Sequence, residues 1–177
     1  MRLIVSGIIG GVGLVAIVAV TGFVIVYTGA YNVAASDEHA DFIRWAFSTT
    51  MHSSVERRAD GIAAPESFSD DMIAAGASRY KAMCAHCHAG PGVERADWAE
   101  GMRPQPPHLI EAAAEWEARE IYWIVANGIK MSGMPAFAAS HDPEELWSLV
   151  AFVDRLPGMT AEDYAGYPDP DESSQTR

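Results

Sequence analysis

The chain has 177 residues and carries 12 Lys and Arg against 24 Asp and Glu, a formal net charge of −12. This length accommodates a membrane segment plus one domain of about 100 residues. The acidity argues against nucleic acid and anionic lipid headgroups as ligands and favours a basic protein partner.

The N-terminal segment is the first expected element. Residues 3–27 carry no charge and are almost wholly apolar. About 20 apolar residues span a bilayer, whereas a cleaved signal peptide has an apolar core of about 7–15. We therefore expect residues 1–30 to form an uncleaved transmembrane anchor, although Val33-Ala34-Ala35 resembles a cleavage site. The positive charge of Arg2 favours a cytoplasmic N-terminus and an extracytoplasmic position for everything after the anchor.

Residues 31–68 are expected to form a helical connector and a linker. A helix is predicted over residues 36–58, capped by its first residue, a serine. Phe42 and Trp45 share one face of this helix. Trp45 and Phe47 suit contact with a membrane, a partner subunit or the next domain. Residues 60–67 contain the Gly, Pro and small side chains of a linker.

Three main helices are expected in a domain over residues 69–160. The first begins after Ser69, whose residue type predicts an N-cap, and the second covers about residues 117–127 before Asn-Gly ends it. The third begins at Asp142, where Asp, Pro and Glu form a consistent helix start. The remaining residues, 161–177, are expected to form a polar C-terminal tail.

The most specific motif of the chain lies at residues 84–88, which are Cys-Ala-His-Cys-His and include both cysteines of the sequence. C-x-x-C-H is the attachment signature of a c-type haem. Each thiol can add to one haem vinyl group, and the histidine then becomes the proximal ligand of the iron. The long irregular segment over residues 90–107 suits wrapping a haem edge. We therefore predict one covalently attached haem c.

Three other interpretations of this pentapeptide have less support. A thioredoxin-type dithiol would sit near a βαβ pattern, which is not evident in the sequence. A structural zinc site usually has a second Cys or His pair, and a second C-x-x-C is absent. His86, His88 and His108 are nevertheless candidate zinc ligands. A disulfide between Cys84 and Cys87 would be strained within a helix.

The second axial ligand is sought downstream, in residues 128–137. Met134 follows a glycine that allows close backbone approach and precedes a proline that favours an extended backbone. A thioether there favours ferrous iron and raises the reduction potential. Met131 is the alternative, and His108 and His141 are more distant candidates.

The order of these motifs resembles a class I cytochrome c. The helix before C-x-x-C-H, the proline-containing loop, the Asn-Gly-Ile helix end, Gly-Met-Pro-Ala-Phe and the capped last helix carry this resemblance over about residues 70–158. The closest pattern is the short, membrane-anchored monohaem type akin to the cytochrome subunits of cbb3-like oxidases. The resemblance implies an all-α fold, with an N-terminal transmembrane helix followed by a helical haem domain.

The family pattern also implies roles for individual residues. Cys84 and Cys87 would bind the haem covalently, with His88 proximal and Met134 distal. Pro106-Pro107 resembles the loop beside the haem propionates. First and last helices would cross where Gly76 and Tyr80 meet two apolar side chains of the last helix, Leu149 and Phe152.

The expected function is single-electron transfer rather than enzymatic catalysis. The protein would be a tethered shuttle or a complex subunit between respiratory or dehydrogenase partners. It would cross the bacterial inner membrane once and hold its haem domain in the periplasm. Neither nucleic acid nor a small-molecule substrate is expected. The alternative is a haem enzyme or small-ligand sensor in which Met134 leaves the iron.

Overall fold

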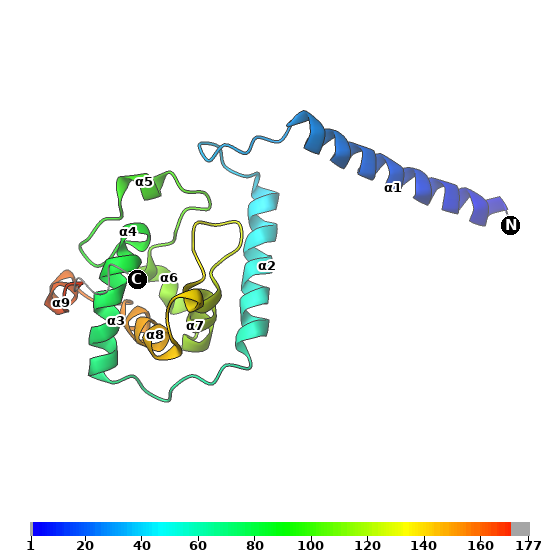
Figure 1. The fold of residues 1–177 in the computed structure, drawn as a ribbon. Helices are drawn as coiled ribbons and strands as arrows, with labels where there is room; N and C mark the ends of the chain where they lie inside the picture. Colours follow the sequence, from blue (N-terminus) through cyan, green and yellow to red (C-terminus); the bar gives the residue numbers. More distant parts are fainter. Residues whose placement is uncertain (1, 171–177) are drawn as a thin grey trace. The chain divides into compact units, whose positions relative to one another are not determined.

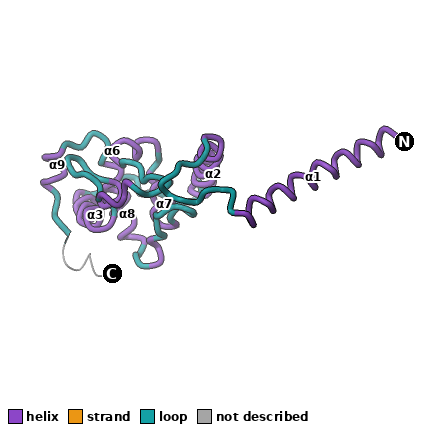
Figure 2. Tube along the Cα trace, turned by 90° about the horizontal axis from the view of Figure 1, so that it is seen from above, coloured by secondary structure: helices purple, strands orange, loops and turns teal. Residues whose placement is uncertain are grey.

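The computed structural model of this protein describes residues 2–170 (Figure 1). Within that range the elements are helical (Figure 2). The single β-type pairing in these residues is an isolated bridge between Gly90 and Val93. The all-α prediction is therefore confirmed. Of the tail expected over residues 161–177, the last seven positions, 171–177, lie outside the described residues. The chain divides into two compact units, the first ending at Asp37 and the second beginning at Glu38.

The first unit contains one long apolar helix, α1 (Arg2–Thr28). Its apolar stretch, Ile4–Thr28, has 25 residues, and none of them is buried within the protein. At about 1.5 Å per residue this length suffices to cross the hydrocarbon core of a bilayer. A membrane anchor and a signal sequence both contain such a helix.

The second unit consists of short and medium helices around one core. Its α-helices are α2 (Asp41–Ala59), α3 (Asp70–Met83), α4 (Ala85–His88), α5 (Asp97–Glu100), α6 (Leu109–Ala112), α7 (Ala118–Asn127), α8 (Pro143–Arg155) and α9 (Ala161–Gly166). Two 3-10 turns, η1 (Ala113–Glu115) and η2 (Phe137–Ala139), complete the set.

Helix α2 begins five residues later than expected. Its N-cap is Ala40 rather than Ser36, because the preceding backbone forms a turn in which the Asp37 N–H donates to the carbonyl of Ala34. Its second half packs on α7 and buries Val55 and Ala59. In its first half Phe42 and Trp45 are 72% and 61% exposed. These two aromatic side chains therefore do not pack against the domain.

The three main helices of the domain begin where sequence signals place them. Ser69 Oγ accepts a hydrogen bond from the N–H of Met72 and caps α3. Asp142 caps α8 in a reciprocal capping box with Glu145. Helix α7 also starts with a capping box, formed between its N-cap Glu117 and Glu120. Each cap satisfies backbone N–H groups that have no partner inside the helix.

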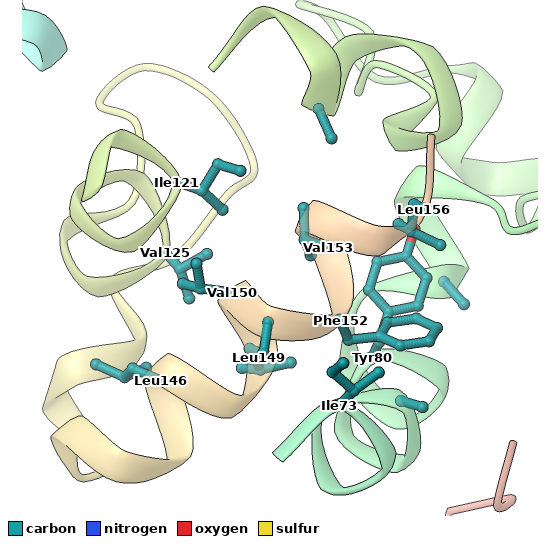
Figure 3. Packing of buried hydrophobic residues seen from close by; sticks show 14 of the residues in the cluster. Ile73, Tyr80, Ile121, Val125, Leu146, Leu149, Val150, Phe152, Val153 and Leu156 are labelled. Carbon is teal, nitrogen blue, oxygen red and sulfur yellow. The ribbon is translucent and has the colours of Figure 1, made fainter. Parts of the chain in front are cut away.

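The core lies where α8 packs on α3 and α7 (Figure 3). Tyr80 of α3 and Phe152 of α8 contact with ring centroids 5.3 Å apart, as the expected helix crossing implies. Gly76 makes this crossing close, since a Cβ atom added to it would lie 2.6 Å from the Ser148 carbonyl carbon. Leu149 is fully buried beside them.

Helix α9 was not among the elements expected from the sequence. Thr160 and Asp163 form a capping box at its start. Tyr164 is 4% exposed and lies edge-on to Tyr80, with ring centroids 6.4 Å apart. Part of the expected polar tail thus belongs to the core of the domain.

Candidate haem-binding site

The Cys-Ala-His-Cys-His motif lies at the junction of two helices. Cys84 is both the C-cap of α3 and the N-cap of α4, while Cys87 and His88 are in α4 itself. Both thiols are free and partly accessible. Two cysteines one helical turn apart place their sulfur atoms on the same side of the helix. This arrangement suits two thioether bonds to one porphyrin edge.

The ring of His88 is held by a backbone carbonyl from a distant loop. Its Nδ1 lies 2.8 Å from the carbonyl oxygen of Pro107. A carbonyl oxygen only accepts hydrogen bonds, so Nδ1 carries the proton and donates it. The lone pair of the imidazole is therefore on Nε2, the atom left for a metal. Metal-ligating histidines are usually fixed in this way by their second ring nitrogen.

The ionisation of the motif favours neutral side chains. Burial raises the pKa of the Cys84 thiol to about 12, with Cys87 adding to the effect. Burial also raises the pKa of Cys87, partly opposed by the charge of Arg95. For His88, burial lowers the pKa more than the hydrogen bond to Pro107 raises it. A neutral imidazole is the form that binds iron.

A buried arginine lies beside the motif. Arg95 is 7% exposed, and its guanidinium donates a 2.7 Å hydrogen bond to the carbonyl of Pro106. Its Nε lies 3.1 Å from Glu100 Oε1 without being aligned for a hydrogen bond. The buried Nε of Arg103 also lacks a hydrogen-bond acceptor among the described residues. Pro106 and Pro107, expected near the haem, thus meet Arg95 and His88 respectively.

Met134 lies in the loop that follows α7. It is half-buried and packs against the same hydrophobic core as Cys84. Gly128, with φ of +64°, brings the start of this loop against its end, since a Cβ atom there would lie 2.7 Å from the Met134 carbonyl oxygen. The Ile129 N–H donates to that oxygen, and Ser132 Oγ accepts from the Met134 N–H. The backbone at Met134 is therefore fixed on both sides.

The other candidates for the distal position have different surroundings. Met131 is 74% exposed and has a positive φ of 63°. His108 is exposed at the start of α6. His141 Nδ1 lies 3.0 Å from Ser140 Oγ and 3.3 Å from the carbonyl of Phe137. Met134 combines partial burial against the core with a backbone that is fixed on both sides.

The zinc interpretation has no matching cluster in this part of the chain. Among the described residues, no three or more His, Cys, Asp or Glu side chains are grouped so that they could hold a metal ion. His86, one of the proposed zinc ligands, is exposed, and its backbone carbonyl accepts from the N–H of Ala96.

The residues present fit a haem c. The motif offers two free thiols and a histidine whose Nε2 is available, and Met134 offers a soft thioether. The Nε of Arg103, buried without an acceptor, suits a carboxylate such as a haem propionate. His88 and Met134 would hold the iron, while Cys84 and Cys87 would hold the porphyrin.

The comparison with known families agrees with this geometry. Residues 71–153 match the family model described as cytochrome c oxidase, cbb3-type, subunit III. This segment is a cytochrome c domain of that family, as the resemblance to class I cytochromes c predicts. Members of this family bind haem c covalently, and the match indicates electron transfer as the function of this domain. No curated protein sequence matches the chain significantly.

Sequence reasoning missed the role of Arg95. The partners of its side chain include a backbone carbonyl, and backbone atoms leave no signature in side-chain spacing. Only the fold shows the contact, because it buries Arg95 and brings its guanidinium to the Pro106 carbonyl.

Proposed function

We propose that this protein is a membrane-anchored, one-electron carrier with a single haem c. Cys84 and Cys87 would attach the haem, and His88 and Met134 would bind its iron. The haem, when bound, supplies the ferric and ferrous states between which one electron is gained and lost. The protein chain holds this group still, excludes water from most of it and sets its potential.

The observation that best supports this proposal is the hydrogen bond from His88 Nδ1 to the carbonyl of Pro107, at 2.8 Å. It fixes the ring orientation and leaves Nε2 with its lone pair. Such a contact has no evident purpose for a surface histidine, since water would satisfy either nitrogen. For an iron ligand it maintains the tautomer and increases the electron-donating strength of the ring.

Met134 is proposed to fill the second axial position. A thioether ligand stabilises the ferrous state relative to the ferric state and so raises the potential. Its fixed backbone would limit rearrangement between the two oxidation states. A filled sixth position also keeps dioxygen and peroxide away from the iron, which suits a carrier better than an enzyme.

The place of the protein in the cell is part of the proposal. Helix α1 would remain uncleaved and cross the bacterial inner membrane once, with the haem domain in the periplasm. Haem c is attached outside the cytoplasm, so the motif and the anchor point to the same compartment. The net charge of −12 suits electrostatic steering of a basic redox partner or complex subunit.

Two methionine variants test the ligand set. In protein expressed with the haem-maturation machinery, Met134→Ala should lose the low-spin six-coordinate spectrum and acquire a lower midpoint potential. Met131→Ala, the matched control in the same loop, should keep both. An unchanged spectrum in Met134→Ala would move the assignment to another ligand.

Carbon monoxide binding separates the carrier from the alternative of a haem enzyme or sensor. The reduced wild-type protein should bind carbon monoxide slowly or not at all, while reduced Met134→Ala should bind it rapidly. Rapid stoichiometric binding by the wild-type protein would instead favour the enzyme or sensor.

A further inference from the structure

The backbone of the Pro106-Pro107 segment can accept hydrogen bonds but cannot donate them. Proline has no backbone N–H, so neither residue can donate a hydrogen bond to the rest of the protein. Their carbonyl oxygens are the backbone groups through which this segment can be tied down. The oxygen of Pro107 accepts from His88 Nδ1 at 2.8 Å, and the oxygen of Pro106 accepts from Arg95 at 2.7 Å.

Arg95 is itself fixed with respect to the haem-attachment motif. The next residue, Ala96, donates its backbone N–H to the carbonyl of His86 at 2.9 Å. The backbone at Arg95 is thus tied to α4 while its side chain reaches the proline segment. Glu100 strengthens the link, because one oxygen pairs with Arg95 Nε at 3.1 Å and the other accepts from Gln105 at 2.6 Å.

We propose that Arg95 is a positioning residue for His88: it holds the proline segment so that the Pro107 carbonyl remains within hydrogen-bonding distance of His88 Nδ1. The inference extends the proposed function, since it concerns the same histidine as an iron ligand. Arg95 acts through the carbonyl of Pro106 and one intervening peptide, and it need not touch the haem. A buried guanidinium is suited to this task because one N–H group can donate to a carbonyl while its positive charge attracts a nearby carboxylate.

The test measures solvent exchange of the His88 Nδ1 proton by nuclear magnetic resonance, in the reduced full-length protein with labelled histidine. A proton in a stable, shielded hydrogen bond exchanges slowly. Arg95→Gln removes the charge and shortens the reach of the side chain. The rate should rise by about tenfold or more, a change comparable to the net value of one hydrogen bond.

Arg79→Gln is the matched control. Arg79 is a half-buried arginine that pairs with Glu145 at 3.0 Å and joins α3 to α8, away from the proline segment. Its replacement should lower the unfolding midpoint yet leave the exchange of the His88 proton unchanged. The comparison separates a positioning effect from a general loss of stability.

A second variant covers the case in which Arg95→Gln does not fold. Arg95→Lys keeps the charge and a donor and should show a smaller increase in exchange rate. The proposal is overturned if every folded Arg95 variant exchanges the His88 proton at the wild-type rate. Absence of covalent haem from the wild-type protein would refute the proposed function, whereas an unchanged exchange rate in haem-loaded Arg95 variants overturns the role of Arg95 alone.

Discussion

The hydroxyl group of Tyr80 donates a 2.7 Å hydrogen bond to the carbonyl oxygen of Ala89. Tyr80 is buried in α3, and Ala89 is the residue immediately after the candidate iron ligand His88. The contact therefore ties the end of the Cys-Ala-His-Cys-His motif to the main helix crossing. Burial raises the pKa of the Tyr80 hydroxyl, which keeps it protonated as a donor across the ordinary pH range.

Tyr80→Phe should destabilise the folded protein by about 1–3 kcal/mol, because it leaves the buried carbonyl of Ala89 without its donor. Denaturant unfolding followed by circular dichroism measures the change. Tyr122→Phe is the control, since the Tyr122 ring stacks on Trp147 and no hydrogen bond of its hydroxyl occurs among the described residues. Equal stability losses in both variants would contradict the importance of the Tyr80 bond.

Ala89→Gly should stabilise the protein. Ala89 has φ of 61° and ψ of −165°, a backbone region that is almost restricted to glycine. Relief of strain worth about 1–3 kcal/mol is partly offset by about 0.4–1 kcal/mol of extra chain entropy in the unfolded state. The thermal midpoint of the variant should therefore rise. A lower midpoint would mean that the alanine side chain makes contacts that outweigh the strain.

The elements set by local signals were predictable from the sequence. Ser69 and Asp142 carry side chains that cap helices within three residues, so α3 and α8 begin where the pattern places them. Gly76 and Tyr80 meet α8 as the family resemblance implies. The determinants of the helix starts lie within a few residues of one another, whereas the crossing with α8 was expected only from the family resemblance.

The features that escaped prediction depend on backbone groups or on distant residues. Helix α2 starts late because a turn precedes it, in which Ala34 accepts from Asp37. The roles of Pro107 and Arg95 depend on carbonyl oxygens brought together by a loop. Periodicity and residue type do not report on such contacts.

Gly76→Ala should destabilise the protein by about 3 kcal/mol or more, at the upper end of the usual cost of overpacking. The added methyl group would meet the backbone of Ser148, which cannot rotate away as a side chain could. Gly61→Ala is the matched control, since nothing lies within 4 Å of its added Cβ atom. A difference of less than about 1 kcal/mol between the two variants, measured by urea unfolding, would contradict the tight crossing.

Gly128→Ala should disturb the candidate distal ligand. The residue has φ of +64°, and an added Cβ atom would lie 2.6 Å from the carbonyl group of Pro135. The backbone that carries Met134 must then move, so the low-spin spectrum should weaken and carbon monoxide should bind faster. Gly101→Ala, where the nearest atom is 3.5 Å away, should leave both unchanged. A wild-type spectrum in Gly128→Ala would show that the Met134 segment is not held in place at Gly128.

Intact-mass measurement of the full-length protein, produced with the haem-maturation machinery, tests the central proposal most directly. The wild-type chain should carry the added mass of one haem that survives denaturation. Peptides spanning residues 84–88 should contain it, and a Cys84→Ala, Cys87→Ala double variant should lack it. A wild-type chain without added haem mass, under conditions in which another c-type cytochrome matures, would contradict the account.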